Sequence, residues 1–184
     1  MKILLPNTMP LNPRLPDGWE SIVVDVDDEI SPENMDAEAL VVWGASRRHL
    51  ESAARGMDGL RLVQTLSAGV DSVLSAGFRP GVMVASGSGL HDRTVTEHTL
   101  ALILMLLRRL PASLESQSQH EWSRELGGIQ ELHPAHRVTT LLDANVLVWG
   151  FGNIAQTLAP VLRSLGAKVT GVAHQGGERG GFPV

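Results

Sequence analysis

A glycine-rich turn between two apolar runs constrains the fold more than any other feature of this sequence. Residues 150–155 are Gly-Phe-Gly-Asn-Ile-Ala, and they join the apolar run 145–149 to a helical segment over residues 154–165. Gly166 is placed to end that helix, and a second apolar run follows at residues 168–172. This order of strand, tight turn, helix and strand is typical of the first βαβ unit of a dinucleotide-binding Rossmann domain.

The small residues of this turn each have a physical role in holding a dinucleotide. Gly150 permits the tight turn, Gly152 lets the backbone approach a pyrophosphate, and Ala155 allows close packing of helix on strand. The free N–H groups and the positive end of the helix dipole would then hold the phosphates. The alternative is a purely structural glycine turn. The expected cofactor contacts are Gly150, Phe151, Gly152, Asn153 and Ile154.

The end of the second strand lacks the acidic residue that usually holds the adenosine ribose of NAD. That end is Val-Ala-His-Gln at residues 172–175. Without a carboxylate, the 2′-phosphate of NADP is not repelled, and His174 or Arg179 is placed to meet it. The alternative is that His174 is simply an exposed loop residue. The sequence therefore predicts NAD or NADP as cofactor and slightly favours NADP.

The first half of the chain has the pattern of an α/β protein with a parallel sheet. Apolar runs at residues 2–5, 21–26, 39–43, 61–65 and 82–85 predict strands with helical segments between them. Ser46 is placed as the N-cap of a helix over residues 47–55, with Gly56 as its C′ glycine. The runs 22–24 and 40–42 do not alternate, so we expect both faces of these strands to be covered.

A long helix is predicted over residues 93–109, and its stretch 100–107 is apolar on every side. Burial of each Leu, Ile or Met contributes about 1.5–3 kcal/mol, so exposure of this stretch would forfeit on the order of 10 kcal/mol. We therefore expect it to be covered all round, either between two domains or in a homodimer interface. Residues 111–137 are more polar and predict an arm or connector.

Composition excludes several kinds of chemistry. The chain has no Cys, which excludes disulfides, thiolate nucleophiles and Cys-built zinc sites, and no Tyr, which excludes phenolic general acids. The net charge of −5 argues against nucleic acid as a partner. The longest apolar run, residues 100–107, is too short to cross a membrane, so we expect a soluble cytoplasmic protein. The histidine pairs 91/98 and 133/136 lack a third ligand at a telling spacing, so no metal site is expected.

Four stretches, in this order and spacing, resemble the D-isomer-specific 2-hydroxyacid dehydrogenases. They are Leu-Val-Gln-Thr-Leu-Ser-Ala-Gly-Val-Asp at residues 62–71, Thr-Val-Thr-Glu-His-Thr-Leu-Ala-Leu at 94–102, Thr-Leu-Leu-Asp at 140–143 and the glycine turn at 150–155. The resemblance implies an α/β protein with a flavodoxin-like substrate domain over residues 1–92. Residues 93–184 would then hold the linking helix, the arm and the first βαβ unit of an NAD(P)-binding Rossmann domain.

The resemblance also implies where the substrate binds. In the family, the loop that matches Ser67, Ala68, Gly69 and Val70 holds the substrate carboxylate through backbone N–H groups, and such a small-residue loop suits an anion. A plain strand-to-helix turn is the alternative. Residues 86–89, Ser-Gly-Ser-Gly, correspond to the crossing between domains, where glycine would serve as a hinge. Glu97 and His98 are expected to be structural.

The chemistry that the resemblance implies is NAD(P)-dependent oxidation of small D-2-hydroxy acids or reduction of 2-oxo acids, of the glyoxylate, hydroxypyruvate or phosphoglycerate type. The family uses a histidine, a glutamate and an arginine that lie C-terminal to the Rossmann turn, so we expect them beyond Val184 and expect residues 1–184 alone to be inactive. Two alternatives remain: a non-catalytic dinucleotide-sensing protein of the same family, and a flavodoxin-like or receiver-type domain suggested by the first five strands.

Overall fold

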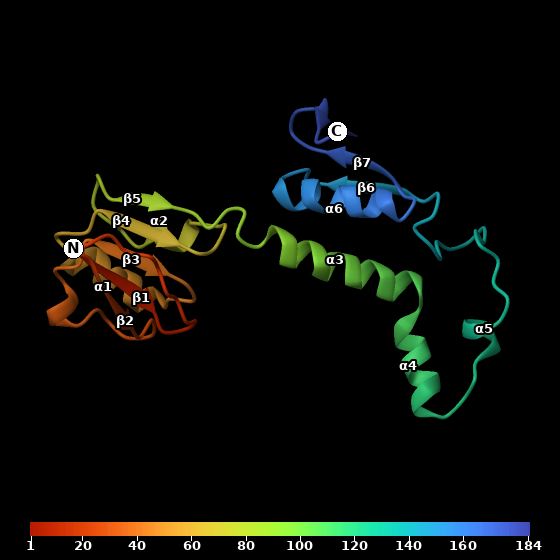
Figure 1. The fold of residues 1–184 in the computed structure, drawn as a ribbon, viewed down its shortest axis with the longest axis horizontal. Coiled ribbons are helices and arrows are strands. Elements are labelled where there is room, and N and C mark those ends of the chain that lie inside the picture. Colours follow the sequence, from red (N-terminus) through yellow and green to blue (C-terminus); the bar gives the residue numbers. More distant parts are fainter. The chain divides into compact units, whose positions relative to one another are not determined.

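The computed structural model describes residues 1–184 and contains two compact units, Met1–Leu90 and His91–Val184 (Figure 1). Each unit has a hydrophobic core of its own. No helix is both long enough and apolar enough to span a membrane. No group of three or more His, Asp or Glu side chains is placed to hold a metal ion.

The first unit is built on a five-stranded parallel sheet with the strand order β2-β1-β3-β4-β5. Its strands are β1 Lys2–Pro6, β2 Glu20–Val24, β3 Ala39–Val42, β4 Leu62–Thr65 and β5 Met83–Ala85. In the register, Leu4 pairs with Ile22 on one side and with Leu40 on the other. This order is that of flavodoxin-like sheets. The prediction of an α/β fold with a parallel sheet is confirmed.

Coverage of the sheet differs between its centre and its edge. All four residues of β3 are buried, as the non-alternating run predicts. The same expectation is wrong for β2, because Val23 is 64 % exposed. The strand order explains the difference: β2 lies at the edge of the sheet, where helices cover less of its surface.

Helix α1, Arg47–Gly56, begins as predicted and ends differently. The Ser46 hydroxyl accepts a hydrogen bond from the His49 N–H at 3.1 Å, which makes Ser46 an N-cap. Gly56 is the last helical residue rather than a C′ glycine, and Met57 is the C-cap, its N–H bonded to the Ala53 carbonyl. A Cβ on Gly56 would lie 2.5 Å from the sulfur of Met35, so a larger residue here requires the flexible Met35 side chain to move. The short helices η1, Pro32–Asn34, and α2, Asp71–Ser75, complete the unit.

The second unit contains four helices and two small sheets. The helices are α3 Asp92–Leu107, α4 Leu110–Ser118, α5 Arg124–Gly127 and α6 Asn153–Ser164; the strands are β6 Asn145–Trp149, β7 Lys168–Val172, β8 Glu178–Arg179 and β9 Phe182–Pro183. Strands β6 and β7 pair in parallel over the predicted residues, and β8 and β9 form an antiparallel hairpin. The arm predicted over residues 111–137 contains α4 and α5, which the sequence pattern did not indicate.

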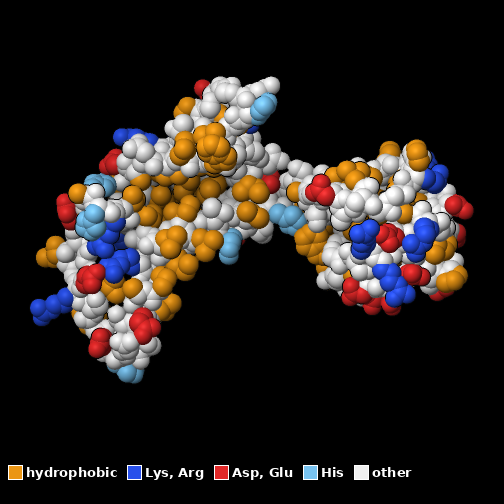
Figure 2. Space-filling view, turned by 180° about the vertical axis from the view of Figure 1, so that it is seen from behind, with side chains coloured by type: hydrophobic (Ala, Val, Ile, Leu, Met, Phe, Trp, Pro, Cys, Tyr) orange, Lys and Arg blue, Asp and Glu red, His pale blue; other side chains and the backbone are white.

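Within the second unit, helix α3 is covered on one side. Leu100, Ile103, Leu104 and Leu107 pack on the core of the second unit, where α3 also contacts α6. Leu106 is 70 % exposed. The expectation that the helix is covered all round, between two domains or in a homodimer interface, stays a prediction. Figure 2 shows hydrophobic side chains exposed over a wide part of this unit. The helix also ends two residues early, because Arg109 has a φ of 53° and starts α4 instead.

Candidate functional site

The glycine turn of the second unit lies where β6 passes into α6. Gly150 has a φ of 89°, a left-handed conformation that glycine adopts without strain. Its N–H donates to the Val172 carbonyl at 2.8 Å, which ties the start of the turn to the end of β7. The turn is therefore fixed at the carboxyl ends of two parallel strands, the edge where α/β sheets bind ligands.

No neighbouring atom covers the two glycines of this turn. A Cβ on Gly150 or on Gly152 would meet no atom within 4 Å. Gly152 is the N-cap of α6 with no side-chain cap, and the first turn of α6 has no acidic residue. The N–H groups that begin a helix have no partner within it, so here they face open space that an anionic group can enter. These residues fit the phosphates of a dinucleotide.

The other residues of the turn divide into two groups. Asn153 and Ile154 are exposed, whereas Phe151 and Ala155 are buried in the core of the unit. The ring of Phe151 lies 6.1 Å from that of Phe182 in β9. Phe151 can therefore offer a ligand only its backbone, while Ala155 lies in the core that α6 shares with β7.

The two residues expected near the ribose are placed differently. His174 is exposed just after β7. Arg179 reaches back to the turn: its Nη1 donates to the Phe151 carbonyl at 3.1 Å, and its Nη2 donates to the Gln175 carbonyl at 3.3 Å. The structure thus places the Arg179 guanidinium against the backbone of the glycine turn. The spacing of the sequence did not indicate this contact.

Thr96 is a residue that sequence reasoning missed. It is buried in α3, and its hydroxyl lies 3.5 Å from the carbonyl oxygen of Ile154, to which it donates. It belongs to the stretch 94–102, where Glu97 and His98 are both exposed. The link between this stretch and the first turn of α6 therefore runs through the threonine.

The candidate anion loop of the first unit follows β4. The Ser67 N–H donates to the Thr65 hydroxyl at 3.1 Å, and the Ser67 carbonyl accepts the Gly87 N–H at 2.8 Å. Ala68 and Gly69 are exposed, and Val70 precedes α2 without a side-chain cap. The Ser67 backbone groups are thus already bonded, and the exposed backbone of Ala68 and Gly69 is the part of the loop that an anion can reach. A Cβ on Gly87 would collide with the Leu66 carbonyl, which explains glycine in the 86–89 segment.

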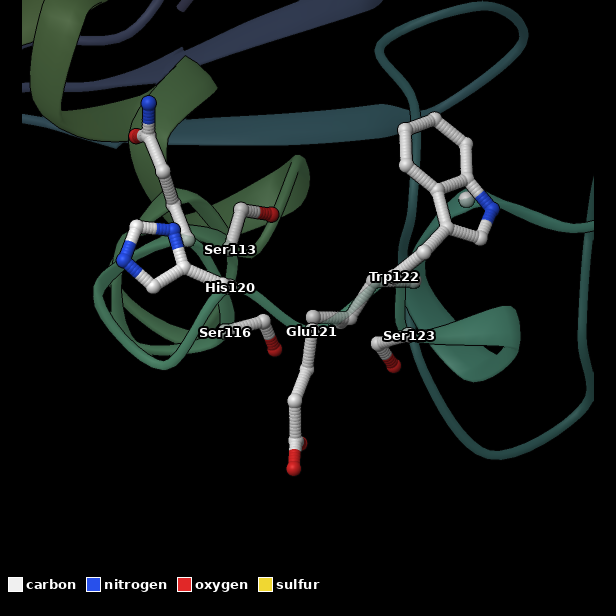
Figure 3. Close-up of a pocket in the computed structure, with 9 residues that line it drawn as sticks. Ser113, Ser116, His120, Glu121, Trp122 and Ser123 are labelled. Carbon is white, nitrogen blue, oxygen red and sulfur yellow. The ribbon is translucent and has the colours of Figure 1, made fainter.

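A separate cavity of about 590 Å³ lies in the arm, between α4 and α5 (Figure 3). Ser113, Ser116, His120, Glu121, Trp122 and Ser123 are among its lining residues. The Trp122 indole is 84 % exposed, and His120 has a φ of 55°. No residue of this cavity belongs to the glycine turn or to the Ser67 loop.

An ion pair ties the start of α4 to α5. Arg109 Nη1 lies 2.7 Å from Oε1 of Glu125. The hydrogen bond from this guanidinium, followed by its charge, lowers the pKa of Glu125. This pair joins two helices of the arm.

Comparison with known proteins gives a consistent result. Residues 100–180 match the family model for the D-isomer specific 2-hydroxyacid dehydrogenase, NAD binding domain. The chain is 30 % identical over 135 residues to a D-3-phosphoglycerate dehydrogenase of Mycobacterium tuberculosis, which covers 73 % of this chain and 24 % of that protein. A Bacillus subtilis D-3-phosphoglycerate dehydrogenase is 26 % identical over 148 residues, 80 % of this chain and 26 % of its own.

Solved structures share the fold. A D-isomer specific 2-hydroxyacid dehydrogenase family protein from Aeromonas salmonicida matches with a TM-score of 0.72 and 23 % identity, over 98 % of this chain and 56 % of its own. An NADPH-dependent glyoxylate/hydroxypyruvate reductase from Sinorhizobium meliloti, solved with NADP and sulfate, matches with a TM-score of 0.67 and 23 % identity, over 99 % of this chain and 55 % of its own.

The chain spans about a quarter of the length of the curated relatives and rather more than half of the solved structures. The family match covers β6, α6 and β7, the elements around the glycine turn, and the second half of α3. The resemblance carried by the four sequence stretches is confirmed: this chain belongs to the D-isomer-specific 2-hydroxyacid dehydrogenase family.

Proposed function

We propose that this chain forms part of an NAD(P)-dependent oxidoreductase that oxidises the CH–OH group of small D-2-hydroxy acids or reduces the corresponding 2-oxo acids. The observation that carries the proposal is the open space beside Gly150 and Gly152 at the start of α6. Both residues lie within the stretch that matches an NAD binding domain. The relatives support substrates of the glyoxylate, hydroxypyruvate or phosphoglycerate type.

The two units have separate tasks in this proposal. Residues 93–184 hold the cofactor, whose phosphates accept hydrogen bonds from N–H groups of the glycine turn and of the first turn of α6. Residues 1–92 hold the substrate, whose carboxylate accepts hydrogen bonds from backbone N–H groups of the Ser67–Val70 loop. The nicotinamide ring, when bound, supplies or accepts the hydride.

The reaction also needs a proton donor or acceptor for the hydroxyl and a cation for the carboxylate. We propose that a histidine paired with a glutamate, together with an arginine, supply these groups from sequence that follows residue 184. Support comes from coverage, since residues 1–184 span only 56 % of the Aeromonas family member. By this proposal residues 1–184 alone bind cofactor and do not turn over substrate.

NADP is the proposed preference between the two cofactors. The end of β7 carries no carboxylate to repel a 2′-phosphate, and His174 is exposed beside it.

A second copy of the chain is the proposed partner for the exposed side of α3 and α4. Leu102, Leu106, Leu110 and Leu114 recur every four residues, and their exposed fractions range from 42 % to 70 %. Residues four apart lie on the same side of a helix, so these leucines form an apolar stripe on each helix. Burial of such a stripe against its copy in a homodimer would remove it from water.

Two measurements together test the function. Calorimetric titration with NADH and with NADPH measures cofactor binding, and loss of reduced-cofactor absorbance with glyoxylate or hydroxypyruvate measures turnover by the protein that contains this chain. Binding with turnover is the expected result. Binding without turnover of any short 2-oxo acid would instead support a dinucleotide-sensing protein, and absence of binding would overturn both.

A further inference from the structure

We propose that Arg179 is a positioning residue for the phosphate-binding turn: it holds the Phe151 carbonyl and thereby directs the Gly152 N–H towards the cofactor. The inference rests on the proposed dinucleotide function and adds a role that the glycine pattern does not contain. Arg179 lies in β8, outside the βαβ unit, yet its Nη1 is 3.1 Å from the Phe151 carbonyl oxygen.

The planarity of the peptide bond links these two groups. The Phe151 carbonyl and the Gly152 N–H belong to one peptide unit, and in a trans peptide they point in opposite directions. No peptide bond of this chain is cis. When Arg179 holds the carbonyl on the hairpin side, the Gly152 N–H is turned to the opposite side. A Cβ on residue 152 would meet no atom within 4 Å, so there is open space beside this residue.

The glycine at position 152 explains why the orientation of the preceding peptide must be held by another group. Gly152 has no side chain to restrict rotation of the peptide that precedes it, and glycine populates more backbone conformations than any other residue. If this peptide flipped, the Phe151 carbonyl would face the phosphate in place of the N–H, and two negative groups would meet. A hydrogen bond from a charged donor opposes the flip more strongly than one from a neutral donor.

The hairpin that carries Arg179 is itself anchored to the turn. The ring of Phe182 in β9 packs against that of Phe151, and the guanidinium of Arg163 lies 4.4 Å from the centre of the Phe182 ring. Reciprocal hydrogen bonds of 2.8 and 2.9 Å between Gly177 and Val184 close the base of the hairpin. Arg179 is therefore held on a fixed support.

The contacts of Arg179 also distinguish a residue that orients the turn from a residue that binds the 2′-phosphate directly. Both Nη atoms donate to carbonyl oxygens, Nη1 to Phe151 and Nη2 to Gln175. A group that orients the turn affects the pyrophosphate, which NADH and NADPH share. A 2′-phosphate ligand would affect NADPH alone.

The test compares Arg179→Met, Arg179→Lys and the control Lys168→Met by calorimetric titration with NADH and with NADPH. Lys168→Met removes an exposed cation from the start of β7, the end of that strand away from the glycine turn. We expect Arg179→Met to weaken binding of both cofactors by the same factor, about tenfold, as for one lost hydrogen bond from a charged group. Arg179→Lys should restore part of the loss, and Lys168→Met should leave both affinities within about twofold.

Three results would overturn the proposal: a loss confined to NADPH, no loss for either cofactor, or an equal loss in Lys168→Met. Thermal unfolding without cofactor shows whether each variant folds, and if Arg179→Met does not, the intermediate loss expected for Arg179→Lys decides the matter. Hydrogen exchange of the Gly152 amide in the cofactor-bound protein, expected to quicken in Arg179→Lys, gives an independent measure. If the unsubstituted protein binds neither cofactor, the proposed function itself fails.

Discussion

The ring of Phe151 lies so close to the α-carbon of Gly171 that a Cβ on residue 171 would overlap its Cγ and Cδ2 atoms. Phe151 is the second residue of the glycine turn, and Gly171 is the fourth of the five residues of β7. The absence of a side chain in β7 thus allows the turn to anchor itself in the core.

This contact predicts that Gly171→Ala destabilises the second unit by about 1–3 kcal/mol, the usual cost of overpacking a core. The neighbouring substitution Thr170→Val, on an exposed position of the same strand, is the control and should change the free energy of unfolding by less than about 0.5 kcal/mol. Denaturant unfolding followed by circular dichroism measures both. Equal stability of the two variants would show that the ring moves aside without cost.

Gly152→Ala should weaken cofactor binding without weakening the fold. Gly152 has a φ of −89°, which alanine adopts readily, and its Cβ would project into the space assigned to the phosphates. We expect at least a tenfold rise in Kd for NADPH, measured by calorimetry, with an unchanged melting temperature. Gly59→Ala is the matched control, since its Cβ makes only an ordinary contact of 3.5 Å in the first unit. Unchanged affinity in Gly152→Ala would remove the phosphates from this turn.

Leu106→Glu should shift the protein from dimer to monomer. Leu106 is 70 % exposed in α3, and a carboxylate buried in an apolar interface is strongly unfavourable. Sedimentation velocity over a range of concentrations measures the change. Leu74→Glu, at a leucine of the first unit that is 64 % exposed, should leave the assembly intact. A monomer before any substitution would refute the proposed interface.

Ser46→Ala should lower the free energy of unfolding by about 1 kcal/mol, the typical cost of a lost N-cap. The Ser46 hydroxyl accepts the His49 N–H at the start of α1. Ser72→Ala, at an exposed position of α2, serves as the control and should cost less. Chemical denaturation of the two variants in parallel distinguishes the cap from a general effect of removing serine.

The pKa of Asp36 should lie below the ordinary value for aspartate. The Lys2 ammonium lies 2.6 Å from the Asp36 carboxylate, and the hydrogen bond from Lys2 is the first cause of the lowered pKa. A lowered pKa in the folded state contributes stability above the unfolded pKa of about 4 and loses it as pH falls through the folded value. Carbon-detected NMR titration should show the pKa of Asp36 rise in Lys2→Met and stay fixed in Lys168→Met.

The sequence determined the local elements and their chemistry. The glycine turn, the Ser46 cap, the central strand β3 and the parallel α/β fold all follow from residues close together in the chain, because backbone conformation and hydrophobic periodicity are local properties. The same local patterns predicted the two candidate binding loops, at residues 67–70 and 150–155.

Only the tertiary structure decided how distant residues meet. It placed β2 at the sheet edge, filled the space above Gly56 with Met35, left Leu106 uncovered, and brought Arg179 to the Phe151 carbonyl. These outcomes depend on packing between segments that are far apart in sequence, and no periodicity or spacing encodes which atoms such packing brings together. The position of Arg179 shows the difference most clearly: the sequence supplied a cation near the cofactor, and the fold turned it towards the backbone of the turn.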